Sequence, residues 1–384
     1  MKNVVVVGGG VAGLSACLRL VTCKDINVTL IERYDDVGKR ILVSGNGRCN
    51  FFNSNFLTGL NDPIFDDAKK IATIENSKEF LDFFLKTTKI KLFEEEDGRL
   101  YPYSNRAENI QLAIKEKLFE KKNFKLVKDT IKKIDSDKKL LYGETNRFTY
   151  DNLILALGGM SYNYPKFDYN LFKDLNVKYT NFTPCICPIK LKVNYFKKYS
   201  GLRFFARIVL TLNGKTIYQE DGEVLIKDDG ISGVCIYNLT TYLNPQNLDK
   251  YELHIQVLQH HNVSLNSSDV QEIERNLPTK LVLLIKHYHK ELLEDYQYGG
   301  RRRDKLDVYR DLTFKIDSLY DFKYSQVSKG GVALSELCLP IMKLKKHNQI
   351  FMVGEMLDIT VPCGGYNIGL SMIEGYLAAG AIIY

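Results

Sequence analysis

The segment "NVVVVGGGVAGLSA" at residues 3–16 constrains the fold of this chain more than any other. Its four contiguous valines are typical of a buried strand in a parallel sheet that is covered on both faces. Gly8, Gly10 and Gly13 follow at G-x-G-x-x-G spacing. In such a turn the first glycine permits the tight bend, the second lets a pyrophosphate approach the backbone, and the third lets the helix pack closely on the strand. The segment therefore predicts a strand, a phosphate-binding turn and a helix.

A second apolar segment, "INVTLIE" at 26–32, supports this interpretation because it ends in an acid, Glu32. A carboxylate about 20 residues beyond the glycines is where dinucleotide-binding domains hold a ribose hydroxyl group. Glycine turns also occur in α/β sheets that bind no ligand, so the fingerprint alone is weak. Here strand, turn, helix, strand and acid occur in the expected order. The sequence predicts a dinucleotide-binding α/β domain.

After Glu32 the segment "RYDDVGKRILVSGNGRCNFFN" at 33–53 is rich in turn residues and shows no helical period, so we predict an extended loop against the ligand. Gly45 and Gly47 would let the backbone approach that ligand. Arg48 could contact a phosphate or a carboxylate. Cys49 is either a small packed side chain or a redox thiol. The packed role is favoured, because the chain contains no C-x-x-C pair.

Length and composition limit the alternatives. A chain of 384 residues predicts at least two domains. The net charge is +7, but the lysines are spread along the chain, so charge alone does not indicate nucleic acid. Eight scattered cysteines fit a reducing, cytoplasmic location, and neither a signal peptide nor a membrane-spanning apolar segment is expected. His287 and His289 are two residues apart in a predicted helix and point to different faces, so no metal site is expected.

The periodicity predicts an insertion between two halves of a nucleotide-binding domain. The first half is 1–182, and its segment "NLILALGG" is expected to return to the sheet as a strand beside the nucleotide. Apolar and polar residues then alternate over 183–265, which predicts antiparallel strands with a hairpin at "LNGKT". A helical pattern follows over 266–324. The segment 325–384 returns to α/β character, with a buried strand, the turn "CGGYN" and a helix rich in small residues.

These motifs together resemble one family. The segments "GKRILVSGNGRCNFFN", "LILALGGMSY", "GEVLIKDDGISG", "VSKGGVALSEL" and "GEMLDITVPCGGYNIGLSMIEGYLAAGAI" occur in order. They are similar to bacterial FAD-dependent flavoproteins described as aminoacetone-oxidase-like or as BaiN-like 3-dehydro-bile acid reductases, which are NAD(P)/FAD-dependent oxidoreductases. The resemblance implies a Rossmann-like α/β domain that holds FAD with both ends of the chain, and an inserted β-barrel with a small helical domain. The chain departs from the family after "GGMSY", where "NYPKFDYNLFKDLN" replaces a longer glycine-rich stretch.

The glycine turns and the resemblance together predict the cofactor-binding residues. They are Gly8, Gly10, Val11, Ala12, Gly13, Glu32, Arg33, Lys39, Arg40, Ser44, Gly45, Asn46, Gly47, Arg48, Cys49, Asn50, Ile131, Gly158, Gly159, Gly354, Glu355, Asp358, Gly364, Gly365, Tyr366 and Asn367. No catalytic residue is predicted, although Tyr366 is one candidate proton donor.

The function that follows is an FAD-dependent oxidoreductase that transfers a hydride between the flavin and a small organic substrate, with NAD(P)H as a candidate transient reductant. Aminoacetone oxidation and enone reduction both remain open. One alternative is an FAD-dependent RNA-modifying enzyme, in which the basic segments "RRRDK" at 301–305 and "MKLKKH" at 342–347 would bind phosphate. Another is a non-enzymatic flavin-binding sensor. A small-molecule partner is favoured over nucleic acid, and the sequence does not determine the oligomeric state.

Overall fold

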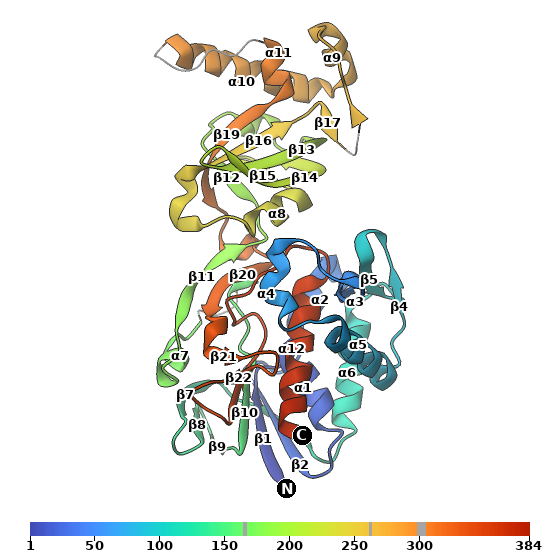
Figure 1. Cartoon of the computed structure of the whole chain (residues 1–384), viewed down its shortest axis with the longest axis vertical. Helices are drawn as coiled ribbons and strands as arrows, with labels where there is room; N and C mark the ends of the chain where they lie inside the picture. The colour runs from blue at the N-terminus through green and yellow to red at the C-terminus, as the bar shows by residue number, and fades with distance from the viewer. Residues whose placement is uncertain (164–166, 261–262, 298–304) are drawn as a thin grey trace. The chain divides into compact units, whose positions relative to one another are not determined.

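The computed structural model describes residues 1–163, 167–260, 263–297 and 305–384 (Figure 1). The chain divides into two compact units. Unit 1 comprises Met1–Thr183 and Val327–Tyr384, and unit 2 comprises Pro184–Gln326. The basic cluster expected at 301–305 lies outside the described residues except for Lys305. Among the described residues, no helix combines the length and the apolar character that a membrane span needs.

Unit 1 is built on a seven-stranded sheet in the order β21-β22-β23-β10-β1-β2-β6. Its strands are β1 (Lys2–Val7), β2 (Ile26–Glu32), β6 (Phe124–Lys128), β10 (Asn152–Leu155), β21 (Leu337–Cys338), β22 (Lys343–Leu344) and β23 (Ile350–Met352). The strands from β23 to β6 are parallel, and β21 and β22 form an antiparallel edge. β10 therefore lies beside β1, and the C-terminal segment returns to the same sheet, as the sequence predicted.

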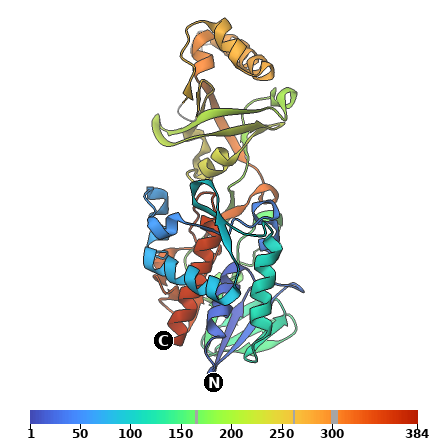
Figure 2. The same cartoon turned by 90° about the vertical axis from the view of Figure 1, so that its right-hand side faces the viewer.

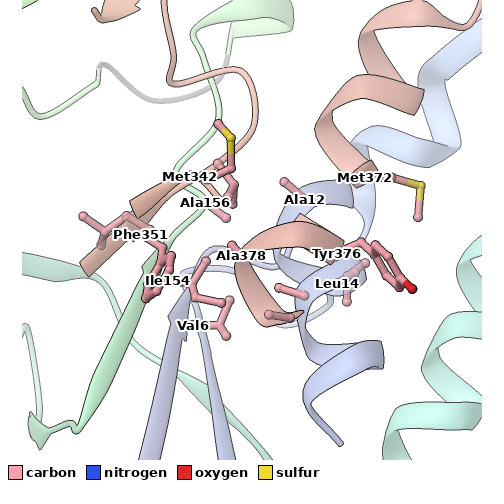
Figure 3. Close-up of a cluster of buried hydrophobic side chains, with 14 of the residues drawn as sticks. Val6, Ala12, Leu14, Ile154, Ala156, Met342, Phe351, Met372, Tyr376 and Ala378 are labelled. Atoms are coloured by element: carbon pink, nitrogen blue, oxygen red, sulfur yellow. The ribbon is translucent and has the colours of Figure 1, made fainter. Parts of the chain in front are cut away.

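Two helices from opposite ends of the chain lie side by side in unit 1: α1 (Val11–Leu20) and α12 (Tyr366–Ile383) (Figures 1 and 2). Their backbones approach so closely that a Cβ atom on Gly375 would lie 2.0 Å from the carbonyl oxygen of Ala12. Ser15 Oγ also donates a hydrogen bond to the carbonyl of Met372 at 2.6 Å. Figure 3 shows the buried cluster in which sheet and helices meet, including Val6, Ile154, Phe351, Ala12, Leu14, Met372 and Ala378.

The remaining elements of unit 1 surround this core. Its other helices are α2 (Lys39–Val43), α3 (Asn55–Thr58), α4 (Asp66–Lys69), α5 (Ile74–Thr88), α6 (Ala107–Phe119) and α7 (Asn170–Asp174). One small sheet consists of β3 (Phe52–Asn53), β5 (Arg99–Pro102) and β4 (Leu92–Glu94). Another consists of β7 (Ile131–Asp135), β8 (Leu140–Gly143) and β9 (Arg147–Thr149). A further sheet pairs β11 (Tyr179–Cys185) with β20 (Val327–Val332).

The prediction of an extended loop after Glu32 is only partly correct. The segment contains the short helix α2 and a 3-10 turn at Ser44–Gly47. Gly38 precedes α2 in the left-handed conformation, with φ of 71°, and Ile41 is buried. A helix of five residues is too short to display an apolar period, so the sequence pattern could not reveal it.

Unit 2 contains a closed barrel in the order β12-β15-β14-β13-β16-β19, which confirms the expected β-barrel. Its strands are β12 (Ile189–Leu191), β13 (Arg203–Leu212), β14 (Lys215–Ile226), β15 (Gly230–Ser232), β16 (Tyr251–Gln256) and β19 (Leu312–Leu319). The hairpin predicted at "LNGKT" joins β13 to β14. Its Asn213 and Gly214 both have positive φ, of 50° and 79°, as a two-residue hairpin turn requires.

The helical pattern predicted for 266–324 is wrong at 312–319, where β19 closes the barrel between β16 and β12. Leu312, Phe314 and Ile316 are buried while Lys315 and Asp317 are exposed, so this segment follows a period of two. The other elements of unit 2 are α8 (Val234–Thr240), α9 (Val270–Asn276), α10 (Thr279–Gln297), α11 (Lys305–Arg310), β17 (Gln259–His260) and β18 (Val263–Ser264). Because β19 directly follows a helical segment, its sequence is easily mistaken for a continuation of the helix.

Candidate functional site

A cavity of about 420 Å³ lies in unit 1 beyond the carboxyl ends of its parallel strands. The residues that follow β1, β2, β6 and β10 each contribute to its wall. In open α/β sheets, ligands bind at this end of the strands. Nine of the predicted cofactor-binding residues line the cavity: Gly8, Gly10, Glu32, Arg33, Lys39, Arg40, Ile131, Gly158 and Gly159.

The three fingerprint glycines have different roles. A Cβ atom on Gly8 would lie 2.1 Å from the carbonyl oxygen of Ala156, and one on Gly13 would lie 2.0 Å from that of Gly8. These two glycines therefore permit the turn and the close packing of α1. Gly10 differs, because a Cβ atom there would meet nothing within 4 Å. It precedes α1 without a side-chain cap, so the first N–H groups of the helix face a space that a phosphate can occupy.

Glu32 lies at the end of β2 and binds the glycine turn directly. Its Oε2 accepts a hydrogen bond from the backbone N–H of Gly9 at 2.6 Å, and its Oε1 accepts one from Tyr34 at 3.0 Å. The carboxylate is thus held at the wall of the cavity, at the position from which the sequence predicts contact with a ribose.

An ion pair between Arg40 and Glu355 joins three segments that are distant in sequence. Arg40 Nη1 lies 2.6 Å from Glu355 Oε2, and Arg40 Nη2 donates to the carbonyl of Gly159 at 2.8 Å. Glu355 Oε1 in turn accepts a hydrogen bond from the backbone N–H of Ser328 at 2.7 Å. Arg40 therefore links the turn after β23 to Gly159, and both Arg40 and Gly159 belong to the cavity wall.

A second group of predicted residues gathers at the start of α12. A Cβ atom on Gly365 would lie 2.4 Å from the carbonyl oxygen of Phe52 and 2.6 Å from Asn50 Oδ1. Asn53 Nδ2 donates to the carbonyl of Gly364 at 2.8 Å. Asn50 Oδ1 is buried and has no hydrogen-bond partner among the described residues. Buried polar atoms are seldom left unpaired, so this oxygen fits a site that a ligand completes.

A family model described as the HI0933-like protein Rossmann domain matches residues 2–381. The chain belongs to this family. Among curated proteins, it is 25% identical to a 3-dehydro-bile acid delta(4,6)-reductase of Clostridium scindens, over 99% of both chains. It is 22% identical to a ribosomal RNA dihydrouridine synthase of Haemophilus influenzae, over 98% of this chain and 97% of that protein.

The fold of this HI0933-like chain also resembles that of a solved dehydrogenase structure. The 3-ketosteroid delta1-dehydrogenase of Sterolibacterium denitrificans, in complex with 1,4-androstadiene-3,17-dione, superposes with a TM-score of 0.51 at 10% identity. The match covers 100% of this chain and 99% of that one, and it concerns the fold alone. Family and fold thus agree with the resemblance that the sequence motifs indicated.

The other predicted residues of this family member do not line the cavity. They are Val11, Ala12, Gly13, Ser44, Gly45, Asn46, Gly47, Arg48, Cys49, Asn50, Gly354, Glu355, Asp358, Gly364, Gly365, Tyr366 and Asn367. Arg48 pairs with Glu95, and its guanidinium lies 4.1 Å from the ring centroid of Tyr101. Asp358 Oδ2 accepts from Thr180 Oγ1 at 3.0 Å, and Asn367 Nδ2 donates to the carbonyl of Val361 at 2.6 Å. Contacts of these side chains with a cofactor stay predictions.

Asp129 is a wall residue that the sequence did not indicate. It follows β6 and accepts hydrogen bonds from the backbone of Thr130, Glu144 and Asn146 at 2.7, 2.8 and 2.9 Å. Burial raises its pKa, but hydrogen bonds from Asn146 and Thr145 more than offset that effect and hold the pKa at about 2. The carboxylate thereby fixes the turn between β8 and β9 against the cavity. Its partners lie up to 17 residues away, so no local motif could have revealed it.

Within the described ranges, no three His, Cys, Asp or Glu side chains are grouped closely enough to hold an ion. His287, one of the two histidines considered in the sequence, lies instead in unit 2, where its Nδ1 is 3.2 Å from Tyr199 Oη.

Proposed function

We propose that this protein is an FAD-dependent oxidoreductase that reduces a carbon–carbon double bond conjugated with a carbonyl group. The observation that carries the proposal is the open space at Gly10, where a Cβ atom would meet nothing within 4 Å, in the wall of the cavity that Glu32 also lines. FAD, when bound, supplies the hydride chemistry. The chain supplies the N–H groups of the first turn of α1 for the pyrophosphate, and Glu32 for the ribose.

The choice of a double bond rests on what two relatives have in common. A delta(4,6)-reductase acts on double bonds of a 3-oxo ring system, and a dihydrouridine synthase saturates the double bond of a uracil ring. Both substrates are rings in which the double bond is conjugated with a carbonyl group. Two relatives with such different substrates share this one chemical step, which favours enone reduction over aminoacetone oxidation.

The chain offers a neutral hydroxyl group for the proton that must follow the hydride. Burial raises the pKa of Tyr366, and its Oη accepts a hydrogen bond from Asn55 Nδ2 at 2.7 Å. Tyr366 lies in the first turn of α12, directly after the Gly364–Gly365 turn. We propose it as the proton donor, with Asn55 fixing its orientation.

The reaction class is tested by anaerobic half-reactions. The purified yellow protein is mixed with NADH, with NADPH and with aminoacetone, and bleaching of the flavin is followed. The reduced protein is then mixed with 4-androstene-3,17-dione, with 2-cyclohexen-1-one or with uridine. We expect at least one enone to reoxidise the flavin with formation of the saturated ketone. Reduction of the flavin by aminoacetone, with no reoxidation by any enone, would reverse the assignment. If neither the reductants nor the substrates change the absorbance of the flavin, the result would instead support a non-enzymatic flavin-binding sensor.

The second candidate is modification of RNA, which the dihydrouridine synthase relative favours. The basic segment at 342–347 is partly occupied within the protein, since Lys345 Nζ donates to the carbonyl of Ser335 at 2.6 Å and Lys346 Nζ to that of Asn176 at 2.7 Å. Binding of ribosomal RNA that weakens steeply as salt rises would support this candidate. Binding that is absent at low salt would exclude it.

We expect Cys49→Ser to keep FAD and its two-electron reduction. Burial raises the pKa of Cys49 to about 11, against a smaller opposing effect from Ser44, so the thiol is protonated and unreactive at neutral pH. Dithionite titration should consume two electrons per flavin in the wild type, in Cys49→Ser and in Cys363→Ala. Four electrons in the wild type, falling to two in either variant, would show a redox disulfide between Cys49 and Cys363 instead.

A further inference from the structure

Five aromatic side chains of unit 1 pack against one another around α7. This aromatic group consists of Phe167, Tyr169, Phe172, Tyr179 and Phe182. The ring centroid of Phe167 lies 4.8 Å from that of Phe172 and 5.1 Å from that of Phe182. Tyr169 lies 5.3 Å from Phe167 between centroids, and its Oη accepts a hydrogen bond from the backbone N–H of Phe182 at 2.8 Å. Three neighbouring rings therefore hold the ring of Phe167 in place.

Phe167 is the member of the aromatic group that lines the cavity. Phe172 and Phe182 are buried, whereas Phe167 is half-buried, so part of its ring stays accessible. Leu171 lies in the same cavity wall and is buried. A ring that is already held in place loses little conformational freedom when a ligand packs on it. This wall therefore offers a preorganised apolar surface to a flat ligand.

The strand order indicates which part of a dinucleotide meets this surface. The glycine turn follows β1, Glu32 ends β2, and residues 129–132 follow β6; these three strands are adjacent in the sheet. With the pyrophosphate at Gly10 and the ribose at Glu32, the base comes next, beyond the end of β6. Ile131 lies there, in the cavity wall and at the start of β7, against which α7 packs. The surface at Phe167 thus adjoins the place of the base.

This wall is a particular feature of the present chain. Phe167 and Leu171 both belong to "NYPKFDYNLFKDLN", the segment in which the sequence departs from the glycine-rich pattern. Glycine has no side chain that could stack on a base or cover it. The aromatic surface is therefore not implied by the G-x-G-x-x-G turn or by Glu32.

We propose that the ring of Phe167 is a stacking surface for the adenine of the cofactor, and that it makes the site selective for an adenine dinucleotide over FMN. The inference rests on the proposed function, because it takes the cavity as the site of FAD. Stacking of a base on an aromatic side chain strengthens binding by about tenfold or more. Tyr169, Phe172 and Phe182 position the ring and do not themselves line the cavity.

The first test is the rate at which FAD leaves the holoprotein after dilution, followed by the fluorescence of the released flavin. Phe167→Leu keeps an apolar side chain but removes the ring, so FAD should leave about tenfold faster than from the wild type. Phe167→Tyr keeps the ring and should release FAD at the wild-type rate. Tyr179→Leu is the matched control, because it removes a ring of the same aromatic group that stacks on Tyr169 outside the cavity wall. It should also release FAD at the wild-type rate.

ADP and FMN distinguish the two ends of the cofactor, because ADP contains the adenine and FMN lacks it. Each is titrated into the full chain after its flavin has been removed by dialysis, and uptake of added FAD checks that the site is intact. Phe167→Leu should weaken ADP binding about tenfold and leave FMN binding unchanged.

A fluorescent reporter tests the contact directly. The chain contains no tryptophan, so one introduced indole reports only on its own surroundings. In Phe167→Trp, ADP should quench the indole emission, because the adenine would stack on that ring. In Tyr179→Trp, the emission should stay constant while ADP binds.

The outcomes separate the inference from the proposed function. Equal FAD release from the wild type and Phe167→Leu would overturn the inference, as would equally fast release from Tyr179→Leu and Phe167→Leu. Equal losses of ADP and FMN binding would overturn it too. If Phe167→Leu does not fold, Phe167→Trp decides, since constant emission while ADP binds would contradict stacking. A wild type that takes up neither FAD nor ADP would instead overturn the proposed function itself.

Discussion

Gly10→Val is expected to abolish flavin retention, by more than about 100-fold in affinity, while the protein folds normally. Gly10 has φ of −78° and ψ of −176°, an extended conformation that valine adopts readily. Its added Cβ would meet no protein atom within 4 Å. The side chain would instead project into the space from which a pyrophosphate approaches the first turn of α1. The backbone N–H groups would remain in place but out of reach of the phosphates.

The measurement is flavin absorbance per mole of purified protein, with a thermal unfolding curve for each variant. Gly10→Ala adds a single methyl group and should give an intermediate flavin content. Ser104→Val places the same side chain at an exposed position outside the cavity and should retain full flavin. Normal flavin content in Gly10→Val would mean that the cofactor does not lie against this turn.

The arrangement of the first glycine turn and of Glu32 in the candidate site was largely predictable, because its signals are local. Gly8, Gly10 and Gly13 follow from their spacing, and Glu32 from its place at the end of a strand. Two further strands of the sheet were also predicted, because "NLILALGG" and "IFMVGE" have the pattern of buried strands. These features need only the residues within one strand–turn–helix unit.

The parts that escaped prediction depend on partners far apart in the chain. Arg40 and Glu355 are separated by 315 positions, and Asp129 finds its partners in a hairpin turn up to 17 residues away. Glu374 looks like an ordinary polar residue in a helix until the fold buries it against Gly354. Periodicity reports which face of an element is apolar, but it does not identify the atom that meets a buried carboxyl group.

Gly10 and Gly365 illustrate the same limit. From the sequence they are equivalent, because each precedes a helix and each is expected to lie against a cofactor. In the structure they are opposites. Gly10 borders empty space, whereas Gly365 is enclosed by the backbone of Phe52 and the side chain of Asn50. The same substitution must therefore have different consequences at the two positions.

Gly365→Val is expected to lose both the flavin and stability. Gly365 has a φ of 87°, which a β-branched residue rarely adopts, and its Cβ would lie 2.4 Å from the carbonyl oxygen of Phe52. The strain and the clash together should lower the free energy of unfolding by about 3 kcal/mol or more. For a domain of this size, the melting temperature should fall by about 10 °C.

The matched control for Gly365→Val is Gly214→Val, in the β13–β14 hairpin of the barrel. Gly214 has a similar φ of 79°, but a Cβ atom there would meet nothing within 4 Å. This variant carries the backbone strain without the clash and lies outside the cofactor domain, so it should keep full flavin and lose less stability. Melting curves and flavin content are measured on the same preparations. If Gly365→Val has the same melting temperature as the wild type, α12 must be able to shift away from Phe52. The start of this helix would then not be a fixed part of the site.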